Sequence, residues 1–365
     1  MLYYKEDWEE VQQRFVAWWE GEVVDRVALA VRAPREVSLG PTEDLREPDD
    51  PYQYWTDPDY RLGQAERVFN RTAYLGEAFP FFAPQIGPGS LALYLGSQPT
   101  LAKETVWYNP IWTDLSTPPR LDYDPDNQWW QTNLRLVSES THRGWGRYLT
   151  TLPDIVENLD VVASLRGTQD LLLDLLDHPD HVHAAQRQVL ELLFRYFDQV
   201  YDLVSPATPG GGLASLFQVW GPGRTAKVQC DFAAMISPKT FEEFVAPYLE
   251  EQCRRLDYSV FHLDGPSCIC HVDALLALPS LDAVQWTPGA ALEGAGSPRW
   301  YDLYRRILRG GKSALILGVQ PEEVEPLVRE LGPEGLFIST TVSSEAEGRR
   351  LLAEALTWSR CRAQW

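Results

Sequence analysis

The stretch Ser259–Leu278, SVFHLDGPSCICHVDALLAL, carries two histidines, two cysteines and two aspartates within twenty residues. His262 and Asp264 stand two residues apart in an apolar run, and the alternation of a β-strand places both side chains on one face. An imidazole and a carboxylate that project together can act as an acid/base pair or as two ligands of a metal ion. The alternative is that Asp264 only caps the following helix or orients His262.

The cysteines of the same stretch form a weaker metal pattern. Cys268 and Cys270 would lie about 200° apart around a helix axis, because an α-helix has about 3.6 residues per turn. Only Cys268 and His271 would then share a face, and the segment lacks the paired CxxC spacing of structural zinc sites. We therefore expect these cysteines to pack as small apolar side chains.

The elements that must position these groups alternate between apolar runs and amphipathic segments. Short apolar runs bounded by polar, Gly or Pro residues predict strands, and most of them precede a helical pattern. Such alternation indicates a parallel sheet covered by helices, and eight units predict an α/β fold with a closed (β/α)8 TIM barrel. The eight predicted strands are 27–31, 82–87, 147–151, 213–221, 259–265, 282–289, 313–319 and 335–341.

We expect a single barrel domain that spans residues 1–365, a length that such barrels reach. Apolar side chains at three- and four-residue spacing predict an N-terminal helix within residues 1–25. Residues of about 40–130 include Pro-, Asp- and Trp-rich segments without a clear period, which indicates insertions that form an aromatic-rich lobe near the barrel mouth. Further helices are predicted over 57–76, 128–141, 170–204, 237–256, 270–278, 297–310, 321–331 and 344–360.

Side chains at the C-terminal ends of barrel strands face the active site, and the loops that follow can add charged groups to it. Arg166 and Arg224 lie in such loops, where each can hold a substrate carboxylate or phosphate or pair with a nearby aspartate. Aromatic and amide side chains at these positions would form the walls of the pocket. The candidates for substrate binding are Trp220, Gln285, Trp286, Arg166, Arg224, Asp154, Asp231, Gln218 and Thr341.

Charge and composition exclude several classes of partner. The 32 basic and 52 acidic residues give a formal charge of −20, which disfavours binding to nucleic acids and to anionic membranes. No GxGxxG or GxxxxGK[ST] motif follows a predicted strand, so we expect no nucleotide cofactor. Five scattered cysteines and an N-terminus without a long apolar run favour a cytoplasmic protein. The 14 Trp and 16 Tyr indicate an aromatic-lined pocket or interface.

Several segments, taken in order, resemble the uroporphyrinogen decarboxylase superfamily, which includes the decarboxylase and methyltransferases that act on corrinoid proteins or thiols. The pairing of an SPxxFxxFxxP helix with a following HxxG motif is the more specific part of the match. The resemblance extends over nearly the whole chain and implies the same barrel. The matching segments are GEVVDRVALAV, MISPKTFEEFVAPYLEEQCRRL, FHLDG, LDAVQWTPG and GVQPEEVEPLVRELGPEGLFIST.

The chain departs from both branches of that superfamily. Arg32 and Arg35 stand where the decarboxylase has an arginine-rich loop for its polycarboxylate substrate, and the loop motif itself is missing. The methyltransferases bind zinc through an HxC pair and a later cysteine, whereas this chain has His262 and Asp264, with Thr341 and no cysteine in the last strand. A His/Asp pair would make a harder metal site than thiolates do.

We therefore expect a divergent member that performs methyl transfer or demethylation on a small polar substrate, with His262 and Asp264 as the catalytic pair. These two residues are also the candidate ligands of zinc or another divalent metal. A corrinoid protein is the candidate protein partner, and a homodimer is a candidate assembly. Two alternatives stay open: a metal-free decarboxylase or lyase that uses His262 and Asp264 as acid and base, and a barrel that binds a ligand without catalysis.

Overall fold

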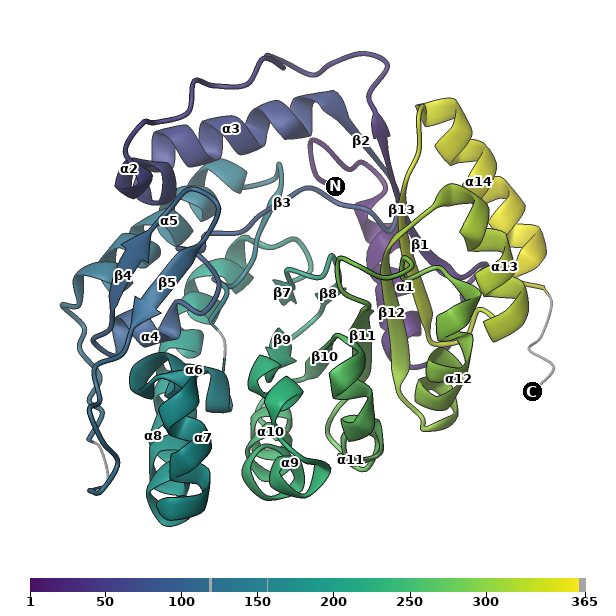
Figure 1. The fold of residues 1–365 in the computed structure, drawn as a ribbon. Coiled ribbons are helices and arrows are strands. Elements are labelled where there is room, and N and C mark those ends of the chain that lie inside the picture. The colour runs from purple at the N-terminus through teal and green to yellow at the C-terminus, as the bar shows by residue number, and fades with distance from the viewer. Residues whose placement is uncertain (118–119, 156, 361–365) are drawn as a thin grey trace.

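The computed structural model describes residues 1–117, 120–155 and 157–360, and its centre is a seven-stranded sheet (Figure 1). The strand order is β2-β1-β13-β12-β11-β10-β9. All neighbours are parallel except β2, which is antiparallel to β1. The strands of this sheet are β1 (Ala28–Pro34), β2 (Thr72–Gly76), β9 (Thr225–Gln229), β10 (Tyr258–Asp264), β11 (Ala283–Thr287), β12 (Ser313–Val319) and β13 (Leu336–Thr341).

Within the described residues this sheet does not close into a barrel, so the predicted closed (β/α)8 architecture is not confirmed. Short strands form separate pairs, β3 with β6, β7 with β8, and β4 with β5. One bridge between Thr151 and Ala214 links the first two pairs, but no ladder joins β7 to β9. The fold is therefore α/β with a central, mostly parallel sheet. The short strands are β3 (Phe81–Phe82), β4 (Gln98–Leu101), β5 (Val106–Asn109), β6 (Leu149–Thr150), β7 (Leu213–Ala214) and β8 (Trp220–Gly221).

Helices pack around the outside of the sheet, and α12, α13 and α14 cover β12, β13 and β1 (Figure 1). None of the described helices is both long enough and apolar enough to span a membrane. The α-helices are α1 (Trp8–Trp19), α2 (Pro51–Thr56), α3 (Pro58–Arg71), α4 (Leu91–Tyr94), α5 (Gln128–Gly144), α6 (Asn158–Arg166), α7 (Thr168–Asp177), α8 (Pro179–Val204), α9 (Pro238–Phe244), α10 (Ala246–Arg254), α11 (Val272–Leu276), α12 (Tyr301–Arg309), α13 (Pro321–Leu331) and α14 (Glu345–Trp358). The 3-10 helices are η1 (Ser205–Ala207), η2 (Asp231–Met235), η3 (Pro266–His271) and η4 (Pro298–Trp300).

Several strands differ from the sequence prediction. β9 carries Lys227 and Gln229, whose polar side chains interrupt the apolar run that marks a strand, and the predicted strand 213–221 is instead the short β7–β8 pair. The predicted helix 57–76 ends at Arg71, and its last five residues form β2. These five residues, TAYLG, include Thr and Tyr, which favour a strand over a helix.

An aromatic cluster fills the inner side of the sheet at the N-terminal ends of its strands. Trp8, Phe15 and Trp18 of α1 are buried there, and the ring of Phe15 stacks on Phe337 of β13 at 5.9 Å. Trp220 of β8 joins this cluster, with its ring centroid 5.7 Å from that of Trp8. The α1 helix thus closes one end of the sheet with apolar side chains, which leaves the C-terminal strand ends for polar groups.

The region predicted as an aromatic-rich lobe contains α2, α3, α4 and the β4–β5 hairpin. These elements pack on α5 and α6, on the side of the molecule away from α14 (Figure 1). Trp55 donates from its indole nitrogen to the Ala102 carbonyl at 2.8 Å, and Trp107 is exposed. Part of the aromatic surplus of the chain therefore holds this region together.

Candidate active site

Polar side chains line up across three neighbouring strands. His262 of β10 is in register with Gln229 of β9 and with Gln285 of β11. Because residues at equal positions of parallel strands project from the same face, the three side chains lie side by side. Asp264 and Asp231 follow His262 and Gln229 by two residues, at the C-terminal ends of their strands. In the described part of the chain, these polar side chains therefore gather at the C-terminal ends of β9, β10 and β11.

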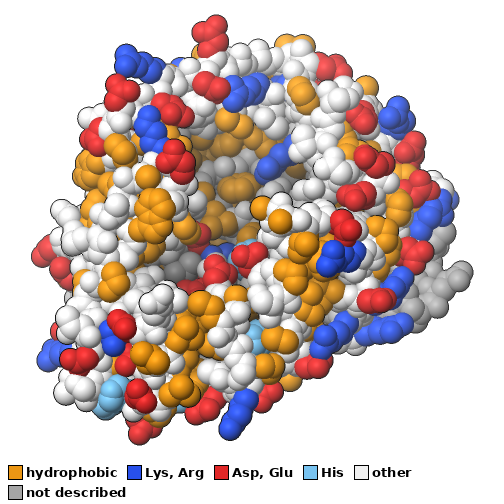
Figure 2. Space-filling view, viewed as in Figure 1, with side chains coloured by type: hydrophobic (Ala, Val, Ile, Leu, Met, Phe, Trp, Pro, Cys, Tyr) orange, Lys and Arg blue, Asp and Glu red, His pale blue; other side chains and the backbone are white. Residues whose placement is uncertain are grey.

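Asp231, His262 and Asp264 converge at this edge. One ligand atom from each, a carboxylate oxygen or an imidazole nitrogen, lies within 4.8 Å of the other two. The space-filling view shows a deep hollow in the molecule with acidic and basic side chains at its floor (Figure 2). Two carboxylates and an imidazole that face one another can hold a cation or exchange a proton.

The His262 imidazole is held in one tautomer by Gln285. His262 Nδ1 lies 2.6 Å from Gln285 Oε1. The Gln285 amide nitrogen donates to the Trp286 carbonyl at 2.7 Å and to Thr287 Oγ1 at 2.9 Å, so its oxygen faces the ring. Nδ1 therefore carries the proton, and Nε2 keeps its lone pair. Burial lowers the pKa of His262, which favours the neutral imidazole that a metal ligand or a base requires.

Asp160 of α6 positions the segment that carries Asp231. Its carboxylate accepts hydrogen bonds from the backbone N–H groups of Asp231 at 2.9 Å and Phe232 at 2.8 Å. The Gln229 amide nitrogen lies 3.1 Å from both Asp160 Oδ2 and Asp231 Oδ2, so it bridges the two carboxyl groups. Burial, and then the charge of Asp231, raise the pKa of Asp160 to about 6.

Lys227 supplies a positive charge beside these carboxyl groups. Its Nζ atom lies 2.6 Å from Asp154 Oδ1, in a pair whose side chains are almost fully buried, and it also contacts Gln229 Oε1. Burial opposes the charge of Lys227, but the neighbouring carboxyl groups raise its pKa. Glu157 is buried nearby and accepts from the Gln229 backbone N–H at 3.1 Å, and burial raises its pKa well above the usual range.

The donor set fits a divalent cation. Imidazole and carboxylate ligands suit zinc and other first-row divalent metals and give a harder site than thiolates do. Gln285 orients His262 and Gln229 orients Asp231, which is the type of outer support that metal ligands require. Asp231 was expected only as a substrate-binding acid, and its place beside His262 was not apparent from the sequence.

The cysteines of the Ser259–Leu278 stretch do not join this cluster. In η3, Cys268 is buried and Cys270 is exposed, so their side chains diverge. His271 is buried, with Nε2 2.9 Å from the Ala233 carbonyl oxygen. Gly265, with φ +77°, makes the turn between β10 and η3 in a conformation that favours glycine.

Both arginines expected to anchor the substrate have acidic partners. Arg166, at the end of α6, pairs with Asp174 at 2.6 Å and with Asp170 at 2.8 Å. Arg224 precedes β9, at the N-terminal edge of the sheet, and pairs with Asp198 at 2.5 Å. Both guanidinium groups therefore already have acidic partners, and the anchoring role expected for Arg166 and Arg224 stays a prediction.

Four further residues of the predicted substrate-binding set lie outside the row formed by Gln229, His262 and Gln285. Trp220 belongs to the aromatic cluster under α1, and Gln218 lies in the turn between β7 and β8. Trp286 follows the inward-facing Gln285 on β11, so it points outward and packs on Trp300 at 5.0 Å. Thr341 ends β13 and is exposed. Of the predicted substrate-binding set, the structure brings Asp154, Asp231 and Gln285 together around His262.

Arg32 is a charged group of the inner face that sequence reasoning did not select. It stands on β1 in register with Thr341 and with Tyr74 of β2. Its Nε atom is buried without a hydrogen-bond partner, its guanidinium carbon lies 5.9 Å from the ring centroid of Phe81, and no acidic partner is present among the described residues. Burial lowers the pKa of Arg32. The sequence signal was a lone arginine at the end of an apolar strand.

Comparison with known proteins gives likenesses of fold to several solved structures. No family model matches the chain, and no curated protein matches it either. A solved structure described as a methyltransferase from Methanosarcina mazei superposes with a TM-score of 0.59 at 12% sequence identity, and the match covers 95% of this chain and 98% of that one. The chain therefore shares the fold of that protein over nearly its whole length.

Proposed function

We propose that this protein is an enzyme that transfers a methyl group to or from a small polar substrate at the cluster of Asp231, His262 and Asp264. The observation that carries the proposal is the convergence of three metal-competent ligand atoms within 4.8 Å at the C-terminal edge of the sheet. The methyltransferase-like fold over nearly the whole chain supports this reaction class. Strand ends at this edge are the usual place for catalytic groups in such folds.

We propose that Asp231, the Nε2 atom of His262 and Asp264 hold a divalent metal, with zinc as the first candidate. Such an ion supplies a Lewis acid that activates a coordinated nucleophile or leaving group. Gln285 keeps the proton on Nδ1, so that Nε2 is available. Lys227 neutralises Asp154 beside the cluster, so that Asp154 adds no net negative charge there.

Arg32 is the group that we propose for substrate positioning. Its guanidinium has no acidic partner in the described chain and its buried Nε lacks a hydrogen bond, so an anionic group of the substrate would satisfy both. Guanidinium groups bind carboxylates in a planar, two-point arrangement. This preference restricts the polar substrate to molecules with an anionic group.

A corrinoid protein remains the proposed methyl donor or acceptor.

The second candidate function is a metal-free lyase or decarboxylase, and the neutral imidazole of His262 beside Asp264 favours it. In that reaction the two side chains would exchange a proton with the substrate. The two functions differ in their requirement for a metal.

The test is the metal content of protein purified without chelators or a His-tag. Stoichiometric metal is expected in the wild type and in Asp302→Asn, a control at an exposed aspartate. His262→Ala and Asp231→Asn are expected to lose it. Methylated donors would then be screened with a corrinoid acceptor. Metal-free wild-type protein with proton-exchange activity that depends on His262 would overturn the proposal and favour the lyase.

A further inference from the structure

The ring of Phe217 lies against the imidazole of the candidate active site. Its centroid is 5.2 Å from that of His262, and the two ring planes are inclined by 43°. Aromatic pairs favour offset or tilted arrangements at such distances. Phe217 is half-buried, so its ring is packed on one part of its surface and open on another. Among the described residues, no other aromatic ring contacts His262.

The turn between β7 and β8 carries this ring. The Ser215 N–H donates to the Val219 carbonyl at 2.7 Å, and the Ser215 hydroxyl oxygen accepts from the Phe217 N–H at 3.2 Å. Gln218 has a φ of +66°, in the left-handed region that residues other than glycine rarely occupy. Among the described residues other than glycine, only Asn158 also has a positive φ. Strained backbone of this kind is concentrated at functional sites.

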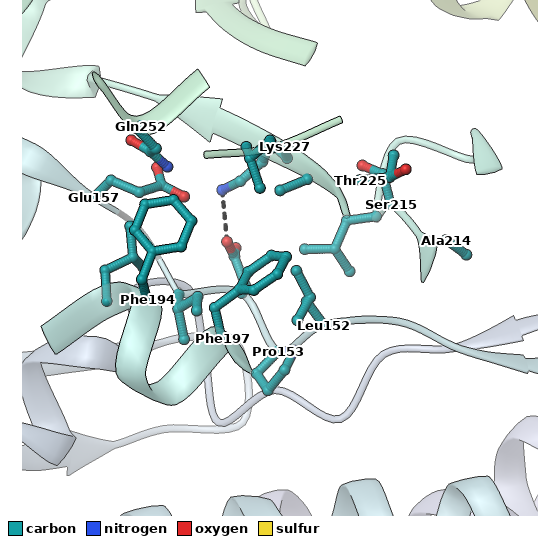
Figure 3. A pocket seen from close by; sticks show the side chains of 16 residues that line it. Leu152, Pro153, Glu157, Phe194, Phe197, Ala214, Ser215, Thr225, Lys227 and Gln252 are labelled. Carbon is teal, nitrogen blue, oxygen red and sulfur yellow. Dashed lines mark hydrogen bonds and ion pairs between the residues drawn. The ribbon is translucent and has the colours of Figure 1, made fainter. Parts of the chain in front are cut away.

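A small cavity between α8 and β9 borders this turn, and Figure 3 labels Ser215 and Lys227 in its lining. Leu216 lines it as well. Its volume of about 30 Å³ has room for about two water molecules and is too small for a side group of a substrate. Phe217 does not line the cavity, since its ring packs on His262 instead. The aromatic ring, and not the cavity, is therefore the feature of this region that acts on the candidate site.

Two contacts together restrict the His262 imidazole. Gln285 Oε1 accepts from Nδ1–H at 2.6 Å, which decides the nitrogen that carries the proton. The outer torsion of a histidine side chain is broad, so one hydrogen bond at the edge of the ring still lets the ring plane rock. A phenyl ring packed against the imidazole blocks part of that rotation. Gln285 thus holds one edge of the imidazole, and Phe217 limits the tilt of its plane.

We propose that Phe217 is a positioning residue for His262, whose ring holds the imidazole in the orientation in which Nδ1 donates to Gln285. The use of Nε2 as a metal ligand rests on the proposed function. The contact between the two rings requires neither metal nor turnover, and Phe217 acts only through His262. The sequence analysis selected the neighbours Gln218 and Trp220 and passed over Phe217.

The first test measures the tautomer of His262 in metal-free protein by long-range proton–nitrogen NMR, at a pH where the imidazole is neutral. The chain has six histidines, and the spectrum of His262→Gln identifies the signal. The wild type is expected in the Nδ1–H form. Phe217→Ala is expected to lower the ratio of the Nδ1–H to the Nε2–H form about two- to tenfold, which corresponds to the strength of an aromatic pair. A folded Phe217→Ala variant with the wild-type ratio would overturn the proposal.

Two further variants make this test specific. Phe81→Ala removes another half-buried ring, one that contacts Arg32, and is expected to leave the ratio unchanged. An equal change in Phe81→Ala would show a general loosening of the fold and would overturn the specific role of Phe217. Phe217→Leu keeps apolar bulk and is expected to change the ratio less than Phe217→Ala does. If Phe217→Ala does not fold, Phe217→Leu decides, and an unchanged ratio there refutes the proposal.

The second test is the zinc affinity of the same variants, measured by competition with a chelating dye. Phe217→Ala is expected to weaken zinc binding about tenfold, as the loss of a group that orients a metal ligand does, and Phe81→Ala is expected to leave it unchanged. Equal zinc affinity in Phe217→Ala and the wild type would overturn the positioning role. If the wild type binds no zinc, the metal site of the proposed function fails, and the tautomer ratio alone decides on Phe217.

Discussion

His262 Nδ1 lies 2.6 Å from Gln285 Oε1, and the two residues are in register on the adjacent strands β10 and β11. The Gln285 amide nitrogen is fully engaged by Trp286 and Thr287, so the amide cannot turn over without losing two hydrogen bonds. The relationship leaves Nε2 as the nitrogen of the imidazole without the proton, and one ligand atom of His262 lies within 4.8 Å of Asp231 and Asp264.

Replacement of Gln285 by Leu is therefore expected to weaken zinc binding about 10- to 100-fold, because the imidazole loses the partner that fixes its tautomer and orientation. The measurement is competition for zinc against a chelating dye. Gln285→Glu keeps an acceptor for Nδ1–H but loses the donor to the Trp286 carbonyl, so it is the comparison variant and is expected to retain more zinc affinity than Gln285→Leu. Equal weakening in both variants would contradict the role of the acceptor.

Replacement of Arg32 by Met is expected to raise the free energy of unfolding by about 1 kcal/mol, because a half-buried charge whose Nε atom has no hydrogen-bond partner is replaced by an apolar side chain of similar length. The same variant is expected to lose binding of anionic ligands. Urea unfolding measures the first effect, and Arg46→Met, at an exposed arginine, is the control without a change. A destabilised Arg32→Met variant would argue against an unpaired charge.

The pKa of Asp160, raised to about 6, predicts a pH-dependent contribution to stability. A carboxyl group whose pKa is higher in the folded state than in the unfolded state stabilises the fold when protonated. That contribution is present at low pH and is lost as the pH rises through the unfolded-state value towards about 6. In metal-free protein, the free energy of unfolding of the wild type minus that of Asp160→Asn is expected to fall between about pH 4 and about pH 6 and to stay constant above that range. A difference independent of pH in urea unfolding would refute this.

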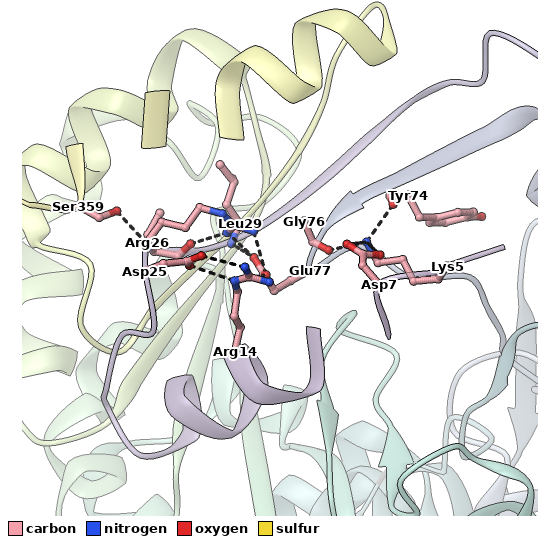
Figure 4. A network of polar contacts seen from close by, with 11 residues as sticks. Lys5, Asp7, Arg14, Asp25, Arg26, Leu29, Tyr74, Gly76, Glu77 and Ser359 are labelled. Atoms are coloured by element: carbon pink, nitrogen blue, oxygen red, sulfur yellow. Dashed lines mark hydrogen bonds and ion pairs between the residues drawn. The ribbon is translucent and has the colours of Figure 1, made fainter. Parts of the chain in front are cut away.

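A buried ion pair joins Arg26, which precedes β1, to Glu77, which follows β2, on the side of the sheet away from β9 (Figure 4). Glu77 has no exposed side-chain surface and accepts from Arg26 at 2.6 and 3.0 Å and from the Leu29 backbone N–H at 2.6 Å. Arg14 of α1 lies 3.7 Å from the same carboxylate. Nearby, Lys5 donates to two backbone carbonyl groups of β2.

Glu77→Gln is expected to lower the free energy of unfolding by about 3–5 kcal/mol, because it leaves the Arg26 charge buried without its counter-ion. Chemical denaturation measures the change. Asp49→Asn removes one partner of an exposed pair with Arg46 and is expected to change stability by less than about 0.5 kcal/mol. Similar losses in the two variants would show that burial does not decide the contribution of the Glu77 pair.

Much of the fold could be predicted from local patterns. The helix predicted over 321–331 coincides with α13, and Pro179 begins α8 as a proline at the first helical turn does. The strands around His262, Gln285 and Ile316 were found because apolar residues dominate them. β9 was missed because its inward side chains are a lysine and a glutamine, which pair with groups distant in sequence.

The sequence by itself determined the α/β alternation, the acidic charge and the common face of His262 and Asp264, since each of these depends on residue types and on spacings of a few residues. Only the tertiary structure decided that the sheet stays open beside β9, that Trp220 faces α1, and that Asp160 holds the segment of Asp231 across a separation of 71 residues. Hydrophobic periodicity and composition carry information only about residues that are close to one another along the chain. The partner of a buried charge is set by which distant segments pack together, and no local pattern contains that information.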